Sequence, residues 1–208
     1  MLFLDDFTSA NVKDFVVAPT SLSMTKDFIE KWHYSKNVNG LTISQVFGLF
    51  YESNLIGAMI YGPLAMASYW KKYASTESKV VELKRLCCID DTPKNTESYF
   101  IGKTLRWLKQ NTTFELVVSY ADTFYGHGGT IYKASNFKHV GMTAKGKVID
   151  YDGKFYHDKC IRTYYVDKTG KKKIKPFAQK IKNELENGTA KYVQMPEKHI
   201  YTYQLINT

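Results

Sequence analysis

Short apolar runs alternate with polar turns along the first half of the chain. Asn11–Thr20 predicts a strand, and Met24–His33 predicts a helix because its apolar side chains recur at helical spacing. Two further apolar runs, Gln45–Tyr51 and Leu55–Tyr61, are separated by the polar turn Glu52–Asn54. This spacing is typical of two antiparallel strands that are joined as a hairpin.

The second half continues with alternating strands and helices. Lys79–Ile89 alternates β-forming and charged residues and predicts a strand, and Ser98–Asn111 predicts a long helix. A short apolar strand is expected at Phe114–Ala121 and a short helix at Gly129–Phe137. Further strands are expected from roughly Val140, Lys154 and Tyr192 onward.

Composition favours one soluble, intracellular domain. The 208 residues, 44% of them hydrophobic, suffice for one sizeable core, so we expect a single domain over residues 1–208. No apolar run is long enough to span a bilayer, and the first residues lack the pattern of a signal peptide. Three cysteines, with Cys87 and Cys88 adjacent, form neither a disulfide framework nor a zinc motif.

The charge points to a polyanionic partner. The formal net charge is +9, and Lys168–Lys182 holds a dense cluster of lysines without an acidic residue. This stretch, at about 167–183, reads as a basic insertion or hairpin. It is either a solvated hairpin tip beside Gly170 or a loop that contacts phosphates.

The element order and one segment resemble the GNAT acyltransferase superfamily. Gly128–Gly141 (GGTIYKASNFKHVG) is similar to the passage from a helix to the next strand in those enzymes. A tyrosine there often protonates the departing thiolate of coenzyme A, so the resemblance gives that place to Tyr132. The implied fold class is α/β, with a mixed, mostly antiparallel central sheet that helices flank.

The resemblance fails at the loop that would hold coenzyme A. GNAT enzymes bind its pyrophosphate on free amides of a glycine-rich loop that opens the helix after the fourth strand. The equivalent stretch, Asp90–Lys103 (DDTPKNTESYFIGK), has two aspartates and one glycine. The donor therefore stays open between acetyl-coenzyme A and another two-carbon donor.

A narrower resemblance covers most of the chain. Four blocks in order are similar to the Mom family of phage DNA-modification proteins: WHYSK at Trp32–Lys36, ELKRL at Glu82–Leu86, TPKNTES at Thr92–Ser98 and SYADTFYGHGGTIYKASNF at Ser119–Phe137. This implies a transferase that adds a carbamoylmethyl group to the exocyclic amine of adenine in double-stranded DNA. It would act in the host cytoplasm and protect bacteriophage DNA from restriction enzymes.

Four residues form the candidate catalytic set. Asp122 arrives at the C-terminal end of its strand, where open α/β sheets hold ligands. Adenine's exocyclic amine is a poor nucleophile, so a catalyst must activate the donor or remove a proton, and His33, Tyr34 and Tyr132 also suit that work. Each also has an ordinary interpretation, as a helix or turn cap for His33 and Asp122 and as a half-buried tyrosine for the others.

The resemblance also implies iron. The family has been linked to this metal, and His33, Tyr34 and Asp122 would supply mixed nitrogen and oxygen ligands. A facial triad needs a second histidine, which His127 would provide.

Three further residues are candidates for binding the donor. Arg85 lies in a strand that is expected to bury Leu83 and Cys87 on the same face, so its charge needs an anionic partner. That partner is Glu82, or else a cofactor or a DNA phosphate. Ser98 or Thr96 caps the following helix, unless the Ser98 hydroxyl faces the donor. The donor-binding set is Arg85, Ser98 and Ser119.

Three functions compete. DNA adenine modification requires the base to be flipped out of the duplex, and a tyrosine-rich region could stack it or could instead be a packed lid. A conventional GNAT N-acetyltransferase would act on a small amine, a tRNA or a protein with acetyl-coenzyme A. An inert DNA-binding protein is favoured by charge alone. The aromatic and basic residues of that region are Tyr61, Tyr69, Trp70, Tyr73, Lys71 and Lys72.

Overall fold

The chain folds into two compact units. A computed structural model describes residues 10–66 and 68–205. The sheet unit comprises the residues up to 142 together with those from 199 onward, and the basic unit comprises Thr143–Lys198. The basic stretch that was expected at about 167–183 lies within this second unit, which is longer than the stretch itself.

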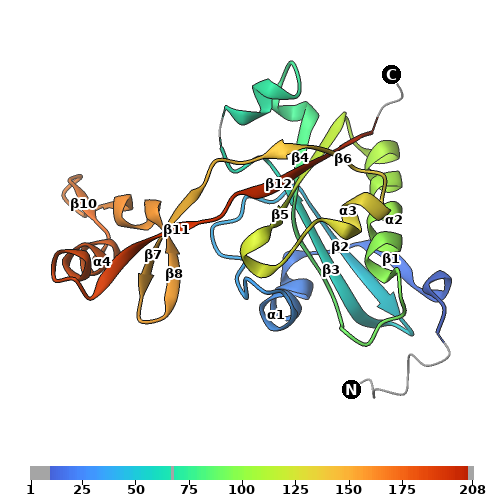
Figure 1. The fold of residues 1–208 in the computed structure, drawn as a ribbon, viewed down its shortest axis with the longest axis horizontal. Coiled ribbons are helices and arrows are strands. Elements are labelled where there is room, and N and C mark those ends of the chain that lie inside the picture. The colour runs from blue at the N-terminus through green and yellow to red at the C-terminus, as the bar shows by residue number, and fades with distance from the viewer. Residues whose placement is uncertain (1–9, 67, 206–208) are drawn as a thin grey trace. The chain divides into compact units, whose positions relative to one another are not determined.

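The sheet unit is built on a seven-stranded sheet in the order β1-β2-β3-β4-β5-β12-β6 (Figure 1). β4 and β5 pair in parallel, whereas β1–β2, β2–β3, β3–β4 and β12–β6 pair antiparallel. The expected α/β class with a mixed, mostly antiparallel sheet is therefore confirmed. The strands are β1 (Val16–Pro19), β2 (Gln45–Tyr51), β3 (Asn54–Gly62), β4 (Val80–Cys88), β5 (Leu116–Asp122), β6 (Lys138–Met142) and β12 (Lys198–Gln204).

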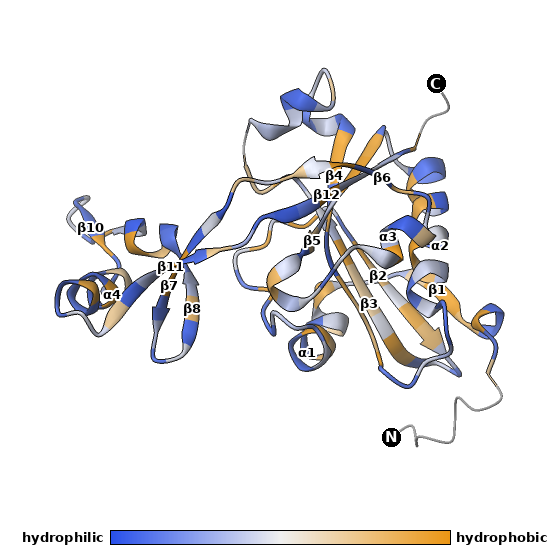
Figure 2. Ribbon diagram, in the orientation of Figure 1, coloured by the Kyte–Doolittle hydropathy of each residue, from blue (hydrophilic) through white to orange (hydrophobic). Residues whose placement is uncertain are grey.

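Helices cover both faces of this sheet, whose strands are largely hydrophobic (Figure 2). Ile29 of α1 is buried with Val46 and Cys87, whereas Phe100 of α2 is buried with Phe47, because strand side chains alternate between faces. The helices are α1 (Leu22–Trp32), α2 (Thr96–Asn111) and α3 (Thr130–Ala134), and the 3₁₀ turns are η2 (Val12–Asp14), η3 (Tyr69–Lys72), η4 (Glu77–Lys79) and η5 (Thr123–Tyr125).

The start of α2 differs from the expected cap. Asn95 is its N-cap, in the left-handed conformation, and makes no side-chain capping bond. The Thr96 and Ser98 hydroxyls donate instead to the carbonyl oxygens of Pro93 (2.6 Å) and Asn95 (3.0 Å). Both residues lie inside the first turn, where a side-chain hydroxyl donates to a carbonyl oxygen that precedes it in the chain and does not accept from the free amides. The prediction that Thr96 or Ser98 caps this helix was wrong.

The basic unit has a small core of its own. Ile149, Ile181 and Ala190 are buried between a three-stranded sheet, in the order β11-β7-β8, and a helix. The helix and β7 were not predicted from the sequence. The elements are β7 (Gly146–Tyr151), β8 (Lys154–His157), η6 (Asp158–Arg162), β9 (Tyr164–Val166), β10 (Lys172–Ile174), α4 (Pro176–Glu186) and β11 (Ala190–Met195).

Within the described residues, every helix is too short or too polar to cross a membrane.

Candidate functional site

A cavity opens where β4 and β5 separate. Their parallel ladder runs from Val80–Leu116 to Leu83–Ser119, yet β4 continues to Cys88 and β5 to Asp122. The cavity between these strands, which we call the site cavity, has a volume of about 420 Å³. Among the residues that line it are His33, Tyr34, Arg85, Cys88, Asp90, Glu97, Tyr120, His127, Gly128, Gly129 and Tyr132.

A β-bulge in β4 determines where Arg85 lies. Leu83 pairs with Tyr61 and Arg85 with the adjacent Ile60, so Lys84 is an extra residue in the ladder. The bulge reverses the alternation of side chains. Leu83 packs on the α2 side of the sheet and Cys87 on the α1 side, so the expectation that they share a face was wrong.

Arg85 brings a positive charge to the site cavity. Its guanidinium donates to the carbonyl oxygens of Asn37 (3.3 Å) and Lys84 (2.7 Å) and forms no salt bridge with the described carboxylates. Glu82, one of the alternative partners considered for Arg85, instead accepts from Lys84 Nζ (3.2 Å) and the Ala65 amide (3.1 Å). Burial lowers the pKa of Arg85. Its charge is therefore available to a polar or anionic ligand.

His33 ends α1 and is 4% exposed. Its Nδ1 accepts from the Ser35 amide (3.1 Å), and Ser35 Oγ lies 2.8 Å from the same nitrogen. Burial, followed by the charges of Arg85 and His127, lowers the pKa of His33 to about 3. The ring is thus neutral near pH 7, with its hydrogen on Nε2, and it can donate a hydrogen bond there.

Tyr34 lies in a stack of aromatic rings. Its centroid is 4.1 Å from that of His33 and 4.3 Å from that of Tyr125, and the His127 ring is 5.1 Å away. Packing among these rings, together with the nearby Asp122 carboxylate, raises the pKa of Tyr34 to about 12. Its hydroxyl therefore keeps its proton at neutral pH and is a donor.

Asp122 lies beside the site cavity at the end of β5. It is 6% exposed, and its Oδ1 accepts from the Phe124 amide (3.2 Å), which caps η5. It follows the cavity-lining Ala121 and acts electrostatically on Tyr34. Asp122 therefore has the capping role that was considered for it, and it also lies next to the other candidates.

Tyr132 of α3 forms one wall of the site cavity. It is 8% exposed and packs against Phe137 and Tyr201 at centroid distances of 5.5 and 5.3 Å. Burial raises its pKa, while a hydrogen bond with Ser119 opposes that rise. Ser119 is fully buried, and its Oγ donates to the Leu83 carbonyl (3.4 Å). Ser119 thus supports Tyr132 where the two strands part.

The glycine pair before α3 allows close packing. Gly129 has φ +76°, and a Cβ there would overlap the Tyr201 ring. The Tyr201 hydroxyl donates to the Gly128 carbonyl (2.9 Å). The missing side chain of Gly129 thus serves packing, and Gly128 and Gly129 also line the cavity.

Ser98 does not join the other candidates. It lines a second cavity of about 350 Å³, together with residues of α2 and of the segment after α3. The structure therefore brings His33, Tyr34, Arg85 and Tyr132 together around the site cavity, with Asp122 and Ser119 behind them, and places Ser98 elsewhere.

The start of α2 does not fit a pyrophosphate. Asp90 and Glu97, on either side of the helix start, both line the site cavity. Two carboxylates beside the free amides would repel the anion that such amides normally attract. The missing glycine-rich loop is thus accompanied by unfavourable charge, and coenzyme A does not fit here in the way its pyrophosphate is usually held.

The donor set does not fit the iron site that was expected from the resemblance. Among the described residues, no three His, Cys, Asp or Glu side chains come together as metal ligands. The Nδ1 of His33 is already an acceptor for Ser35, which leaves a hydrogen on Nε2. We therefore assign no metal to His33, Tyr34 and Asp122.

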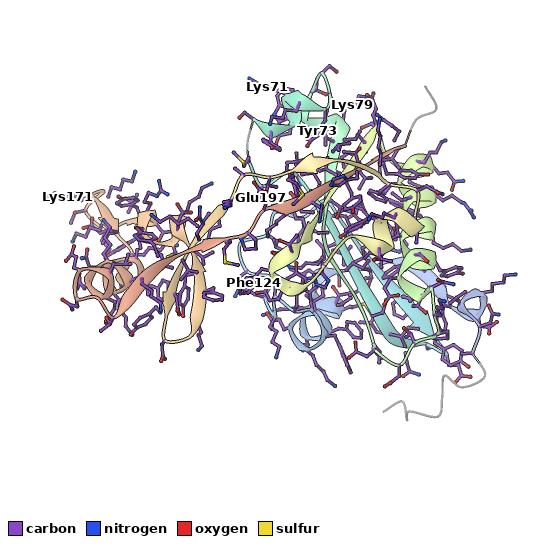
Figure 3. All side chains as sticks on the ribbon, viewed as in Figure 1. Lys71, Tyr73, Lys79, Phe124, Lys171 and Glu197 are labelled. Carbon is purple, nitrogen blue, oxygen red and sulfur yellow. The ribbon has the colours of Figure 1, made fainter. Side chains whose placement is uncertain are left out.

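The tyrosine-rich region is mainly a packed lid. Tyr61 is fully buried and its hydroxyl is 2.8 Å from that of Thr104, so its proposed place on a stacking surface was wrong. Tyr69, Trp70 and Tyr73 are half-buried against a cluster that includes Leu64 and Val80. Tyr73 is labelled in Figure 3. Lys72 and Lys71 lie 4.2 and 5.7 Å from the ring centroids of Tyr69 and Trp70.

The sequence interpretation missed one feature of the site. Tyr125 is 43% exposed and packs on Tyr34. The neighbouring Phe124, which is labelled in Figure 3, is 44% exposed. Two exposed aromatics directly after a strand that ends in a buried carboxylate were the available signal.

Comparison with known proteins identifies relatives of the chain. The Mom protein family model matches residues 14–208. The methylcarbamoylase mom of Escherichia phage Mu is 30% identical over 150 residues, which are 70% of this chain and 61% of that relative. The matched region thus spans less than two thirds of the relative's length.

Solved acetyltransferases share the fold. Arabidopsis thaliana NAA60 in complex with acetyl-CoA is 12% identical, with a TM-score of 0.53, and the match covers 91% of this chain and 98% of that one. The IAA acetyltransferase from Bacillus cereus is 8% identical, with a TM-score of 0.52, over 91% and 99% of the two chains. At these identities the likeness concerns the fold alone.

Proposed function

The chain belongs to the Mom protein family, and we propose that it transfers a two-carbon carbamoylmethyl unit to the exocyclic amine of adenine in double-stranded DNA. The observation that carries this proposal is the convergence of His33, Tyr34, Arg85 and Tyr132 on one cavity, with Asp122 beside it. These groups include hydrogen-bond donors, a cation and a carboxylate, which the reaction needs.

Asp122 removes the proton from the adenine amine in this proposal. The amine's lone pair is delocalised into the ring, so bond formation is helped when a base takes a proton from it. His33 and Tyr34 are poor bases here, because the raised pKa of Tyr34 keeps its proton in place and the lowered pKa of His33 keeps its Nε2 hydrogen as a donor. Asp122 lies next to Tyr34 and is the remaining acceptor of the candidate set.

The donor binds beside Arg85 and Tyr132. The donor class is a carbamoylmethyl compound with a leaving group on its methylene carbon. The amine nitrogen attacks that carbon, the bond to the leaving group breaks, and the leaving group departs with the bonding electron pair. Arg85 binds the donor's amide oxygen, and the Tyr132 hydroxyl, once it releases its hydrogen bond with Ser119, donates a hydrogen bond to the leaving group.

The adenine stacks on the exposed rings at the cavity. A base inside a duplex has its amine paired, so it must be flipped out before reaction. Tyr34 and Tyr125 are 42% and 43% exposed and stack on each other at 4.3 Å, which offers an aromatic edge to an extruded base. The reaction takes place in the host cytoplasm, where the modified adenines protect phage DNA from restriction enzymes.

Nucleoside mass spectrometry tests this function. Plasmid DNA from cells that express the chain should contain an adenine nucleoside that is heavier than deoxyadenosine by a carbamoylmethyl group. Asp122→Asn keeps an acceptor for the Phe124 amide but loses the base, so the modification rate should fall by roughly 10²- to 10⁴-fold. Asp27→Asn, on an exposed face of α1, is the matched control and should leave the yield unchanged. Ordinary nucleosides from cells with the parent chain would exclude the proposal.

N-acetyl transfer is the second candidate, because the fold likeness is to acetyltransferases. It requires acetyl-coenzyme A, which the charge at the start of α2 disfavours. Calorimetric titration with acetyl-coenzyme A separates the two. Tight binding together with an acetylated amine product would favour this candidate over adenine alkylation.

A further inference from the structure

We propose that the basic unit, Thr143–Lys198, is a module that binds the phosphate backbone of duplex DNA through lysines of its β9–β10 hairpin and the adjoining end of α4. The proposal rests on the proposed function for the choice of DNA as the polyanion. It assigns DNA binding to a part of the chain that is separate from the candidate catalytic residues.

Charge is concentrated in this unit. Its 56 residues contain fourteen lysines and arginines and seven acidic residues, an excess of seven in a chain whose net charge is +9. The remaining residues, which are almost three times as numerous, carry an excess of two. The electrostatic attraction of the chain for a polyanion therefore comes mainly from residues 143–198.

Four lysines at the hairpin carry most of the argument. Lys168, Lys171, Lys172 and Lys175 are exposed and lie within eight positions, and none forms a salt bridge with a described acidic residue. Lys171, at the hairpin turn, is marked in Figure 3. We call these four the hairpin lysines. The surface is thus rich in charge that the protein itself does not neutralise.

The acidic residue of the hairpin holds its turn in place. Asp167 pairs with Lys173 (2.9 Å) and accepts from the amides of Thr169 (2.8 Å) and Lys171 (3.0 Å). These bonds lower the pKa of Asp167 to about 2, so it stays ionised at neutral pH. Asp167 therefore orders the turn without pairing with a hairpin lysine.

The hairpin is joined in register to α4. The Lys175 amide donates to the Thr163 carbonyl (2.9 Å), and Lys173 pairs with Tyr165 in the ladder. Lys175 is the N-cap residue of α4, and Lys182 follows about two turns further along the helix. Because an 11-residue helix extends over roughly 16 Å, this array suits a row of phosphates better than one small anion.

Exposed aromatics accompany the lysines. Tyr164 and Tyr165 of β9 are 45% and 42% exposed, and Lys172 lies 4.7 Å from the centroid of the Tyr164 ring. Tyr192 is 45% exposed, with Lys147 at 3.7 Å from its ring centroid. Tyrosine hydroxyls and lysines are common phosphate ligands. Exposed aromatic rings do not increase solubility, so their presence favours a binding surface.

Salt-dependent binding of the full-length chain to duplex DNA is the test. The probe is a fluorescently labelled 30-base-pair duplex, and anisotropy gives Kd over a series of KCl concentrations. Changing all four hairpin lysines to Gln should weaken binding by on the order of 10²-fold at 0.1 M KCl. It should also reduce the slope of log Kd against log [KCl] by about 3.6, since each of the four lost phosphate contacts contributes about 0.9.

A matched control removes the same charge from the sheet unit. Lys13, Lys26, Lys31 and Lys103 are exposed, and none of them lines the site cavity. Changing these four to Gln should alter Kd less than threefold and leave the slope almost unchanged. If both variants lost affinity equally, net charge alone would attract DNA, and the proposal would be overturned.

Two further outcomes separate this proposal from the proposed function. Unchanged duplex binding by the hairpin-lysine variant would overturn the module, whether or not the parent chain modifies adenine. Lysine-dependent duplex binding by a parent chain that leaves adenine unmodified would uphold the module and count against the function. Tighter binding of a single-stranded RNA of the same length would overturn DNA as the partner.

Discussion

The sheet unit and the basic unit differ in where they hold their functional groups: the first buries them, and the second exposes them to solvent. In the sheet unit nineteen buried residues form one cluster, part of which lines the site cavity, and the pKa values of His33 and Tyr34 are shifted by burial and neighbouring charge. The basic unit buries three residues in its cluster and exposes its lysines and several tyrosines. Controlled chemistry needs groups held away from water, whereas attraction to a polyanion needs charge that water can reach.

The difference has an energetic consequence. The basic unit closes its core with Ile149, Ile181 and Ala190, so each buried side chain is a large share of the free energy that holds it folded. Its lysines also repel one another when no polyanion is present. We therefore expect this unit to unfold locally at a lower free energy than the sheet unit, and to gain protection when DNA binds.

The largest expected effect is that of Ile181→Ala. Ile181 is fully buried on α4, and truncating such a side chain costs about 2–5 kcal/mol of unfolding free energy. Amides of residues 143–198 should lose hydrogen-exchange protection and duplex affinity should fall, while amides of the central sheet stay protected. Hydrogen exchange followed by mass spectrometry measures the protection of both units, and the anisotropy titration measures the duplex affinity.

Ile101→Ala is the matched control in the sheet unit. Ile101 is also fully buried, on α2. Its truncation should lower protection around the central sheet and spare the basic unit. If either variant removed protection from both units to the same extent, the two would unfold together and the contrast between them would be wrong.

Arg85→Gln tests the role of the sheet unit, whose site cavity is proposed to bind the donor. Loss of a charged hydrogen bond to the donor should raise the donor concentration needed for half-maximal modification by roughly 30- to 100-fold, without changing duplex affinity. The measurement is the yield of modified adenine against dilution of the small-molecule fraction of a cell extract. Arg106→Gln, at the second cavity, is the control. A larger effect of Arg106→Gln would place the donor in that cavity instead.

Much of the sheet unit follows from local sequence pattern. The prediction for Gln45–Tyr51 coincides with β2, and those for α1, β3, β4 and α2 differ at their ends by at most two residues. These elements have strong apolar periodicity and turn residues at their ends. The helix α4 escaped prediction because its apolar positions, Ala178, Ile181 and Leu185, lie among lysines that read as a solvated segment.

The site depends on information that is not local. The bulge at Lys84 arises from the pairing of β4 with β3, so the sequence of β4 alone wrongly put Leu83 and Cys87 on one face. Glu82 similarly pairs with Lys84, which excludes the Glu82–Arg85 pair that the sequence left as one of two alternatives. The resemblance to the Mom family did select residues that the fold brings to one cavity, although their catalytic roles stay predictions.

The smallest expected effect is a change in how stability depends on pH. The pKa of His33 is about 3 in the folded chain, against an ordinary value of 6.5, so the unfolded chain binds more protons between these pH values. Stability from this group is therefore complete above about pH 6.5 and is lost as pH falls toward 3. Between pH 7 and pH 5 the loss is about 2 kcal/mol, since one pKa unit corresponds to about 1.4 kcal/mol.

His33→Gln should remove that dependence, although it lowers stability at every pH. Urea unfolding at pH 5 and pH 7 should show a smaller difference between the two pH values for the variant than for the parent chain. The matched control is His157→Gln in the basic unit, whose side chain is 69% exposed and already reached by water. Equal pH dependence in the parent and in His33→Gln would mean that His33 is not held as a buried neutral donor. The contrast between a site held away from water and a solvent-exposed charged surface would then rest on Tyr132 alone.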